Sequence, residues 1–211
     1  MRIFAKLGWS GLFVGWLALS AGGLWGLARY QSAAGATAVV PTQWPAGSRV
    51  ARPTDCDTLI LLAHPKCSCT RATLGDLARL MADCSGKLKT VVLFVRPDGE
   101  PANWEKTDLW ESAASIPGVR VFTDSGGVEA QRFGAETSGQ TILYDAQGKL
   151  LFQGGITAGR GHEGDNAGED SIVALVHGNE PVARQTPVFG CPLCGSATAT
   201  DSLSGKATCQ Q

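Results

Sequence analysis

The sequence predicts a three-layer α/β domain that follows a single membrane-spanning helix. An uncharged, mostly apolar run extends from Leu7 to Ala28. From Thr58 onward, apolar runs of strand length alternate with segments that have helical periodicity. Two further strand-like runs flank a short turn, and a last helix follows them. Alternating strands and helices that end in a hairpin and a helix favour a mixed sheet with helices on its faces.

Composition limits the classes of function. The chain has 211 residues, 44% of them hydrophobic, and a formal net charge of -1. That near-neutral balance gives no electrostatic footprint for nucleic acid, so none is expected as a partner. The seven cysteines indicate disulfides, metal binding or redox chemistry, and an odd number leaves at least one of them without a disulfide partner in the chain.

The run from Leu7 to Ala28 is long enough to cross a hydrocarbon core of about 30 Å. Arg2 and Lys6 precede it, which favours an N-terminus in the cytoplasm and a C-terminal domain in the periplasm or outside the cell. The alternative is a signal peptide cleaved near residues 36–38. The run exceeds the apolar core of about 7 to 15 residues that is usual for such peptides, which favours an uncleaved single-pass anchor.

The composition suggests four parts. Residues 1–30 are the anchor, and residues 31–56 are an extended linker in which Pro41, Pro45 and Pro53 oppose any helix. Residues 57–178 form the folded domain. Residues 179–211 are a cysteine-containing tail.

Periodicity predicts the elements of the domain in order. Continuous apolar runs indicate buried strands, spacings of three and four indicate helices with one buried face, and the turn at 146–148 indicates a hairpin. The predicted strands are Thr58–Ala63, Lys89–Val95, Val119–Thr123, Thr141–Asp145 and Lys149–Gln153. The predicted helices are Thr70–Cys84, Trp104–Ala114, Val128–Phe133 capped by Asp124, and a last helix from a cap at Asp165 or Asn166 to Gly178.

This order, together with the segment AHPKCSCTRATL and the segment from Val119 to Gly155, resembles the thioredoxin-like superfamily. Within it, the chain looks most like membrane-anchored periplasmic members that act on protein thiols or copper sites. Two departures stand out. The cysteine spacing is Cys-x-Cys where the family has Cys-x-x-Cys, and Ser138-Gly139-Gln140-Thr141 has no proline where the family keeps a cis-proline.

Cys67 and Cys69 lie where the first strand passes into the first helix. The amide groups and positive dipole of a helix N-terminus favour a thiolate, and Lys66 and Arg71 add positive charge. We expect Cys67 to be the nucleophile, because the residue further into the helix is usually the more buried. A disulfide between residues two apart closes a small, strained ring, so the pair should be relatively oxidising.

Two thiols at this spacing also suit a soft ion such as Cu(I). His162, in the glycine-rich loop after the hairpin, is a candidate third ligand or proton shuttle. A solvated histidine in a loop shaped by its glycines is the plainer interpretation. No cofactor is expected otherwise.

Three further predictions concern the remaining cysteines. The tail from residue 179 to 190 is long enough to bring Cys191 and Cys194 to the main site, where they could form a second redox pair. Half of a zinc site and a local structural disulfide are the alternatives. Cys56 and Cys84 should both lie at the base of the domain, and a structural disulfide between them is expected.

Three functions therefore compete. The first is thiol-disulfide exchange with extracytoplasmic protein partners, with Cys67 attacking and Cys69 resolving. The second is a copper-binding assembly factor that uses Cys67, Cys69 and His162 without turnover. The third is a redox-inert binding module.

Overall fold

The computed structural model describes residues 2–194, with side chains from residue 11 onward. The chain forms two compact units, which divide after Ala33. The first unit is the helix α1 (Arg2–Gln31), in which Gly11–Gln31 is long and apolar enough to cross a membrane. The helix continues past both ends of the predicted run.

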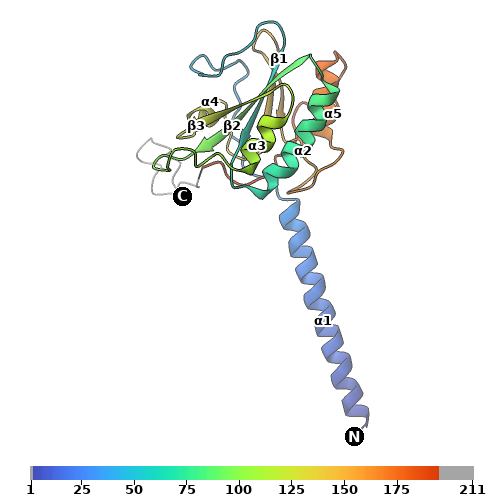
Figure 1. Cartoon of the computed structure of the whole chain (residues 1–211). Coiled ribbons are helices and arrows are strands. Elements are labelled where there is room, and N and C mark those ends of the chain that lie inside the picture. Colours follow the sequence, from blue (N-terminus) through green and yellow to red (C-terminus); the bar gives the residue numbers. More distant parts are fainter. Residues whose placement is uncertain (1, 195–211) are drawn as a thin grey trace. The chain divides into compact units, whose positions relative to one another are not determined.

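The second unit is built on a five-stranded mixed sheet in the order β3-β2-β1-β4-β5 (Figure 1). The central strand β1 pairs in parallel with β2 and antiparallel with β4. The strands are β1 (Asp57–Ala63), β2 (Leu88–Arg96), β3 (Val119–Ser125), β4 (Gln140–Tyr144) and β5 (Leu150–Gly154). This topology is the predicted thioredoxin-like fold, and the element order matches the predicted one.

Helices cover the two faces of the sheet unequally. The first hydrophobic cluster joins one face to α2 (Ser68–Asp83), α3 (Asp108–Ser115) and α5 (Ala167–Val176). On the other face the only helix is the short α4 (Val128–Arg132), as Figure 1 shows for the part of the chain that the structure describes. Side chains of β1 alternate between the two clusters, which explains why its sequence is apolar throughout.

The predicted extended linker at 31–56 is wrong for most of its length. Val40 and Val50 are buried in the second hydrophobic cluster, and Trp44 packs edge-on against Phe133. Main-chain hydrogen bonds join Trp44 N to Gly148 O and Leu150 N to Thr42 O. The segment covers this face of the sheet in place of a layer of helices. Its buried residues are single apolar side chains separated by prolines, and such a pattern has no periodicity from which burial could be predicted.

One helix start and one helix cap differ from the prediction. The helix expected from Trp104 begins only at Asp108, after a turn-rich segment. At α4 the N-cap residue is Gly127 rather than Asp124. The Asp124 carboxylate nevertheless accepts hydrogen bonds from two main-chain groups of the first turn, Glu129 N at 2.9 Å and Ala130 N at 2.8 Å. At α5, Asn166 is the N-cap and accepts from Glu169 N.

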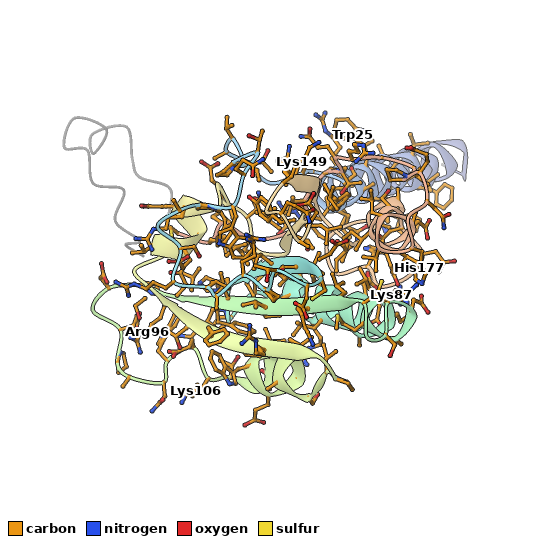
Figure 2. The ribbon with its side chains drawn as sticks, turned by 90° about the horizontal axis from the view of Figure 1, so that it is seen from above. Trp25, Lys87, Arg96, Lys106, Lys149 and His177 are labelled. Atoms are coloured by element: carbon orange, nitrogen blue, oxygen red, sulfur yellow. The ribbon has the colours of Figure 1, made fainter. Side chains whose placement is uncertain are left out.

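The charged surface of the domain shows no gathering among the residues labelled in Figure 2. Arg96 and Lys106 lie on one side of the domain, while Lys87 and Lys149 lie elsewhere on its rim. Their charges are thus spread around the fold.

Candidate functional site

Cys67 and Cys69 lie at the start of α2, as predicted. Cys67 is the N-cap residue, with an extended backbone, and Cys69 lies in the first turn. The side chain of Cys67 is 2% exposed and that of Cys69 is 8% exposed. The expectation that the residue further into the helix is the more buried is therefore wrong, and the reason is a segment that covers Cys67.

That segment is the tail, which runs along the loop before β4. Ser138 N donates to Cys191 O at 2.8 Å and Leu193 N donates to Glu136 O at 2.8 Å, with an antiparallel bridge between Thr137 and Pro192. Leu193 is buried in the second hydrophobic cluster. The prediction that the tail can reach the main site is confirmed for Cys191.

Hydrogen bonds set the ionisation of Cys67. Burial raises the pKa of its thiol, but hydrogen bonds from the side chain and backbone of Cys191, and then from the side chain and backbone of Thr70, outweigh burial. The net result is a pKa below the ordinary value for a cysteine. Cys67 is thus the thiol of this site that ionises most easily, which agrees with its predicted role as the nucleophile.

The two neighbouring thiols retain their protons. Burial raises the pKa of Cys69, and the charge of Cys67 and a hydrogen bond to it raise that pKa further. Burial and then the hydrogen bond to Cys67 raise the pKa of Cys191 to about 12. Cys69 and Cys191 therefore act as S–H donors around one thiolate.

A short chain of hydroxyl groups reaches the same thiolate from the β4 side. His64 N donates to Ser138 Oγ at 2.9 Å, and Ser138 Oγ lies 2.9 Å from Thr70 Oγ1. When Ser138 donates to Thr70, the single hydroxyl proton of Thr70 is shared between Cys67 and His64 O, which lies 3.4 Å from Thr70 Oγ1. Hydroxyl chains of this kind polarise one another and strengthen the last bond.

The nearby positive charge differs from the predicted one. Lys66 lies over the ring of Trp104, with Nζ 4.1 Å from the centroid, and Arg71 pairs with Asp108. Arg160 instead donates to Gly190 O at 2.5 Å, and its charge lowers the pKa values of both Cys69 and Cys191. The glycine-rich loop thus does reach the cysteines, but through its arginine.

This loop is fixed to α2 by polar contacts of the buried Asp76 and the partly exposed Arg79. Asp76 Oδ1 accepts from Gly164 N at 3.1 Å and lies 2.8 Å from Arg79 Nη2. Arg79 Nη2 also lies 3.0 Å from Glu169 Oε2 at the start of α5. These contacts hold the loop in place and thereby position Arg160.

His162 does not join the thiols. It is exposed, and its Nδ1 lies 3.0 Å from Arg160 O in its own loop. Within residues 2–194, no group of three His, Cys, Asp or Glu side chains is arranged to hold a metal ion. The predicted ligand set of Cys67, Cys69 and His162 is therefore not assembled.

Two cysteine pairings also need correction. Cys194 is disulfide-bonded while Cys191 is a free thiol, so these two do not form a disulfide with each other. Cys56 and Cys84 are both free. Cys84 is buried in the first hydrophobic cluster, whereas Cys56 is half-buried and donates to the Asp55 carboxylate at 3.6 Å. Two cysteines at the same end of a domain form a disulfide only if their sulfur atoms also face each other at bonding distance.

Three contributors to the site were missed from the sequence, namely Thr70, Ser138 and Arg160 as the cation. Thr70 could have been predicted, because the side chain three positions after an N-cap residue can reach back to the start of the helix and form a hydrogen bond there. The sequence marks Ser138 only by its place in the loop that has no proline. Nothing in the sequence distinguished Arg160 from Lys66 or Arg71.

Comparison with known proteins supports the fold alone. The chain is similar to a hypothetical protein from Sinorhizobium meliloti 1021, with 19% identity, a TM-score of 0.56, and coverage of 76% of this chain and 93% of that one. An uncharacterized conserved protein from Geobacillus kaustophilus gives 18% identity, a TM-score of 0.56, and coverage of 79% and 94%. No protein-family profile matches the chain, and no curated protein matches it.

Proposed function

We propose that this chain, with its thioredoxin-like fold and apolar N-terminal helix, is a membrane-tethered thiol-disulfide exchange protein. Cys67 is the attacking thiol, and its partners are thiols or disulfides of extracytoplasmic proteins. The basic residues Arg2 and Lys6 before the helix support a domain outside the cytoplasm.

The observation that carries the proposal is the distribution of protons among the three thiols. Cys67 is the N-cap residue of α2 and receives hydrogen bonds that lower its pKa, while Cys69 and Cys191 beside it have raised pKa values. A site with one thiolate and adjacent protonated thiols has the two groups that exchange requires, an attacking sulfur and a second thiol that completes the reaction.

The reaction follows from these groups. The Cys67 thiolate attacks one sulfur of a partner disulfide, forms a mixed disulfide and releases the other sulfur as a thiolate. A second thiol of this chain then loses its proton and attacks Cys67, so the partner leaves with both sulfurs reduced and this chain holds a disulfide. The reverse sequence oxidises a partner dithiol.

Cys67→Ser tests the proposal. The full-length protein in detergent micelles should catalyse glutathione-dependent reduction of a disulfide-bonded protein substrate, and the variant should lose that activity. Cys56→Ser is the matched control, because Cys56 is half-buried outside the site and should keep wild-type rates. Equal rates for the wild type and Cys67→Ser would refute exchange through Cys67.

Copper handling is the alternative that the same thiol pair supports. Its test is titration of Cu(I) into the wild type and Cys67→Ser. A tight 1:1 complex that is lost in the variant, without exchange activity in the wild type, would favour a copper-binding assembly factor. The described residues give this alternative no third ligand at His162, so we rank exchange first.

A further inference from the structure

The tail occupies the approach to Cys67 in the manner of a bound peptide. Residues 136–138 present main-chain groups next to the start of α2, and the tail uses them in an antiparallel arrangement. An extended segment that adds its main chain to exposed backbone groups is a general mode of peptide recognition. Here the segment belongs to the same chain.

Close packing leaves no room for a second segment there. Gly190 passes so near the loop that a Cβ atom at this position would lie 1.9 Å from Ser138 O. Val188 and Leu193, on either side of Cys191, are 1% and 2% exposed. Gly35 N donates to Val188 O at 2.8 Å, which fixes the tail from its other edge. Cys67 is covered as a consequence.

Cys191 meets Cys67 without the constraint that affects Cys69. The sulfurs of Cys67 and Cys69 belong to residues two apart at the start of one helix, where a disulfide closes a small ring. Cys191 arrives on a separate extended segment whose main chain pairs with Ser138, and Ser138 Oγ lies 2.9 Å from Thr70 Oγ1 in the first turn of α2. This places Cys191 beside Cys67, and hydrogen bonding from Cys191 lowers the pKa of the Cys67 thiol. Cys194 is already bonded, so Cys191 is the free thiol in the described part of the tail, residues 179–194.

The geometry points to residues 188–193 as an intramolecular substrate segment: Cys191, rather than Cys69, forms the disulfide with Cys67, and the segment must leave before a partner protein can reach Cys67. This inference rests on the proposed function, since it names the second thiol and the gate of that reaction. In the resolving step, Cys191 loses its proton and attacks Cys67 in the mixed disulfide. The Cys67–Cys191 bond forms, and the partner leaves as a thiolate that takes up a proton.

Oxidised glutathione tests the choice of thiol in the full-length protein in detergent micelles. The Cys67 thiolate takes one glutathione, and the resolving thiol displaces it. Mass spectrometry of the wild type should then give a cross-link between Cys67 and Cys191. Cys191→Ser should accumulate glutathionylated Cys67, whereas Cys69→Ser should still give the cross-link.

Three outcomes separate the two claims. Glutathionylated Cys67 that accumulates in Cys69→Ser but not in Cys191→Ser would overturn the inference and leave exchange through Cys67 intact. The same holds if the wild type gives a Cys67–Cys69 bond. A wild type in which Cys67 never reacts with oxidised glutathione would overturn both the inference and the proposed function.

Gly190→Ala tests the gate. The added methyl group cannot coexist with Ser138 O, so the tail must move and lose main-chain hydrogen bonds on both sides of Cys191. The alkylation rate of Cys67 in the reduced protein should rise about tenfold or more. Val182→Ala, at an exposed position of the same tail, is the control and should alkylate at the wild-type rate. An unchanged rate in Gly190→Ala would show that the tail does not restrict access to Cys67.

Discussion

The hydroxyl of Thr70 is the polar group of the site that is easiest to remove alone. Thr70 is 1% exposed, and its Oγ1 lies 2.9 Å from Ser138 Oγ, while its side chain also hydrogen-bonds to Cys67. Thr70→Val keeps the branched shape and deletes the donor. We expect this substitution to destabilise the thiolate form of Cys67 and so to raise the pKa of its thiol.

The magnitude follows from the type of bond. A hydrogen bond to a charged group contributes about 1.5 to 3 kcal/mol, so its loss should lower the thiolate-to-thiol ratio at a fixed pH by roughly ten- to a hundredfold. The ultraviolet absorbance of the thiolate, followed against pH, measures this ratio without requiring a reagent to enter the covered site. The transition that disappears in Cys67→Ser belongs to Cys67.

Thr73→Val is the matched control. Thr73 is also 1% exposed and lies one turn further along α2, but its hydroxyl donates to Cys69 O at 3.3 Å. If Thr70→Val titrates at the wild-type midpoint, or if Thr73→Val shifts that midpoint equally, the hydroxyl chain does not set the ionisation of Cys67.

Three further predictions concern stability, measured by denaturant unfolding. Burial raises the pKa of Asp76 in the folded protein, so the folded state holds this proton more tightly than the unfolded state. The contribution of Asp76 to the free energy of unfolding should therefore increase as the pH falls through its folded-state pKa toward the ordinary value of 3.8. In Asp76→Asn this increase in stability should be smaller. Phe152→Ala should cost about 3 to 5 kcal/mol at neutral pH, because the ring is fully buried in the first hydrophobic cluster; a cost below about 1 kcal/mol would contradict that packing. Gly168→Ala should cost about 1 to 3 kcal/mol, since its Cβ would lie 2.1 Å from Gly155 O and push α5 away from the main chain just after β5; wild-type stability would refute this contact.

The elements that could be predicted are those with periodic apolar patterns. Thr58–Ala63 is apolar at every position because β1 is central and covered on both faces, and the structure adds only Asp57 to it. The three- and four-residue spacing of α2 likewise marks its buried face. Local pattern was sufficient for the element order and for a mixed sheet, whereas the strand order β3-β2-β1-β4-β5 is a finding of the structure.

The parts that escaped prediction depend on single contacts between distant segments. Val40 and Val50 fill one face of the domain from a segment whose composition is that of a linker. The cation of the site is Arg160, although Lys66 and Arg71 are closer to Cys67 in the sequence, because both of those side chains turn to partners of their own. Chain length showed that Cys191 could reach Cys67, but only the pairing with residues 136–138 places it there.

The hydrogen bond from Gly35 N to Val188 O joins the chain just after α1 to the tail segment that carries Cys191. Thr137 Oγ1 donates to Ala36 O at 2.7 Å, so the loop before β4 is hydrogen-bonded to this part of the chain as well as to the tail. Residues 35 and 36 therefore contact both the tail beside Cys191 and the loop that the tail pairs with. A change that detaches these two residues from the domain should also loosen the cover over Cys67.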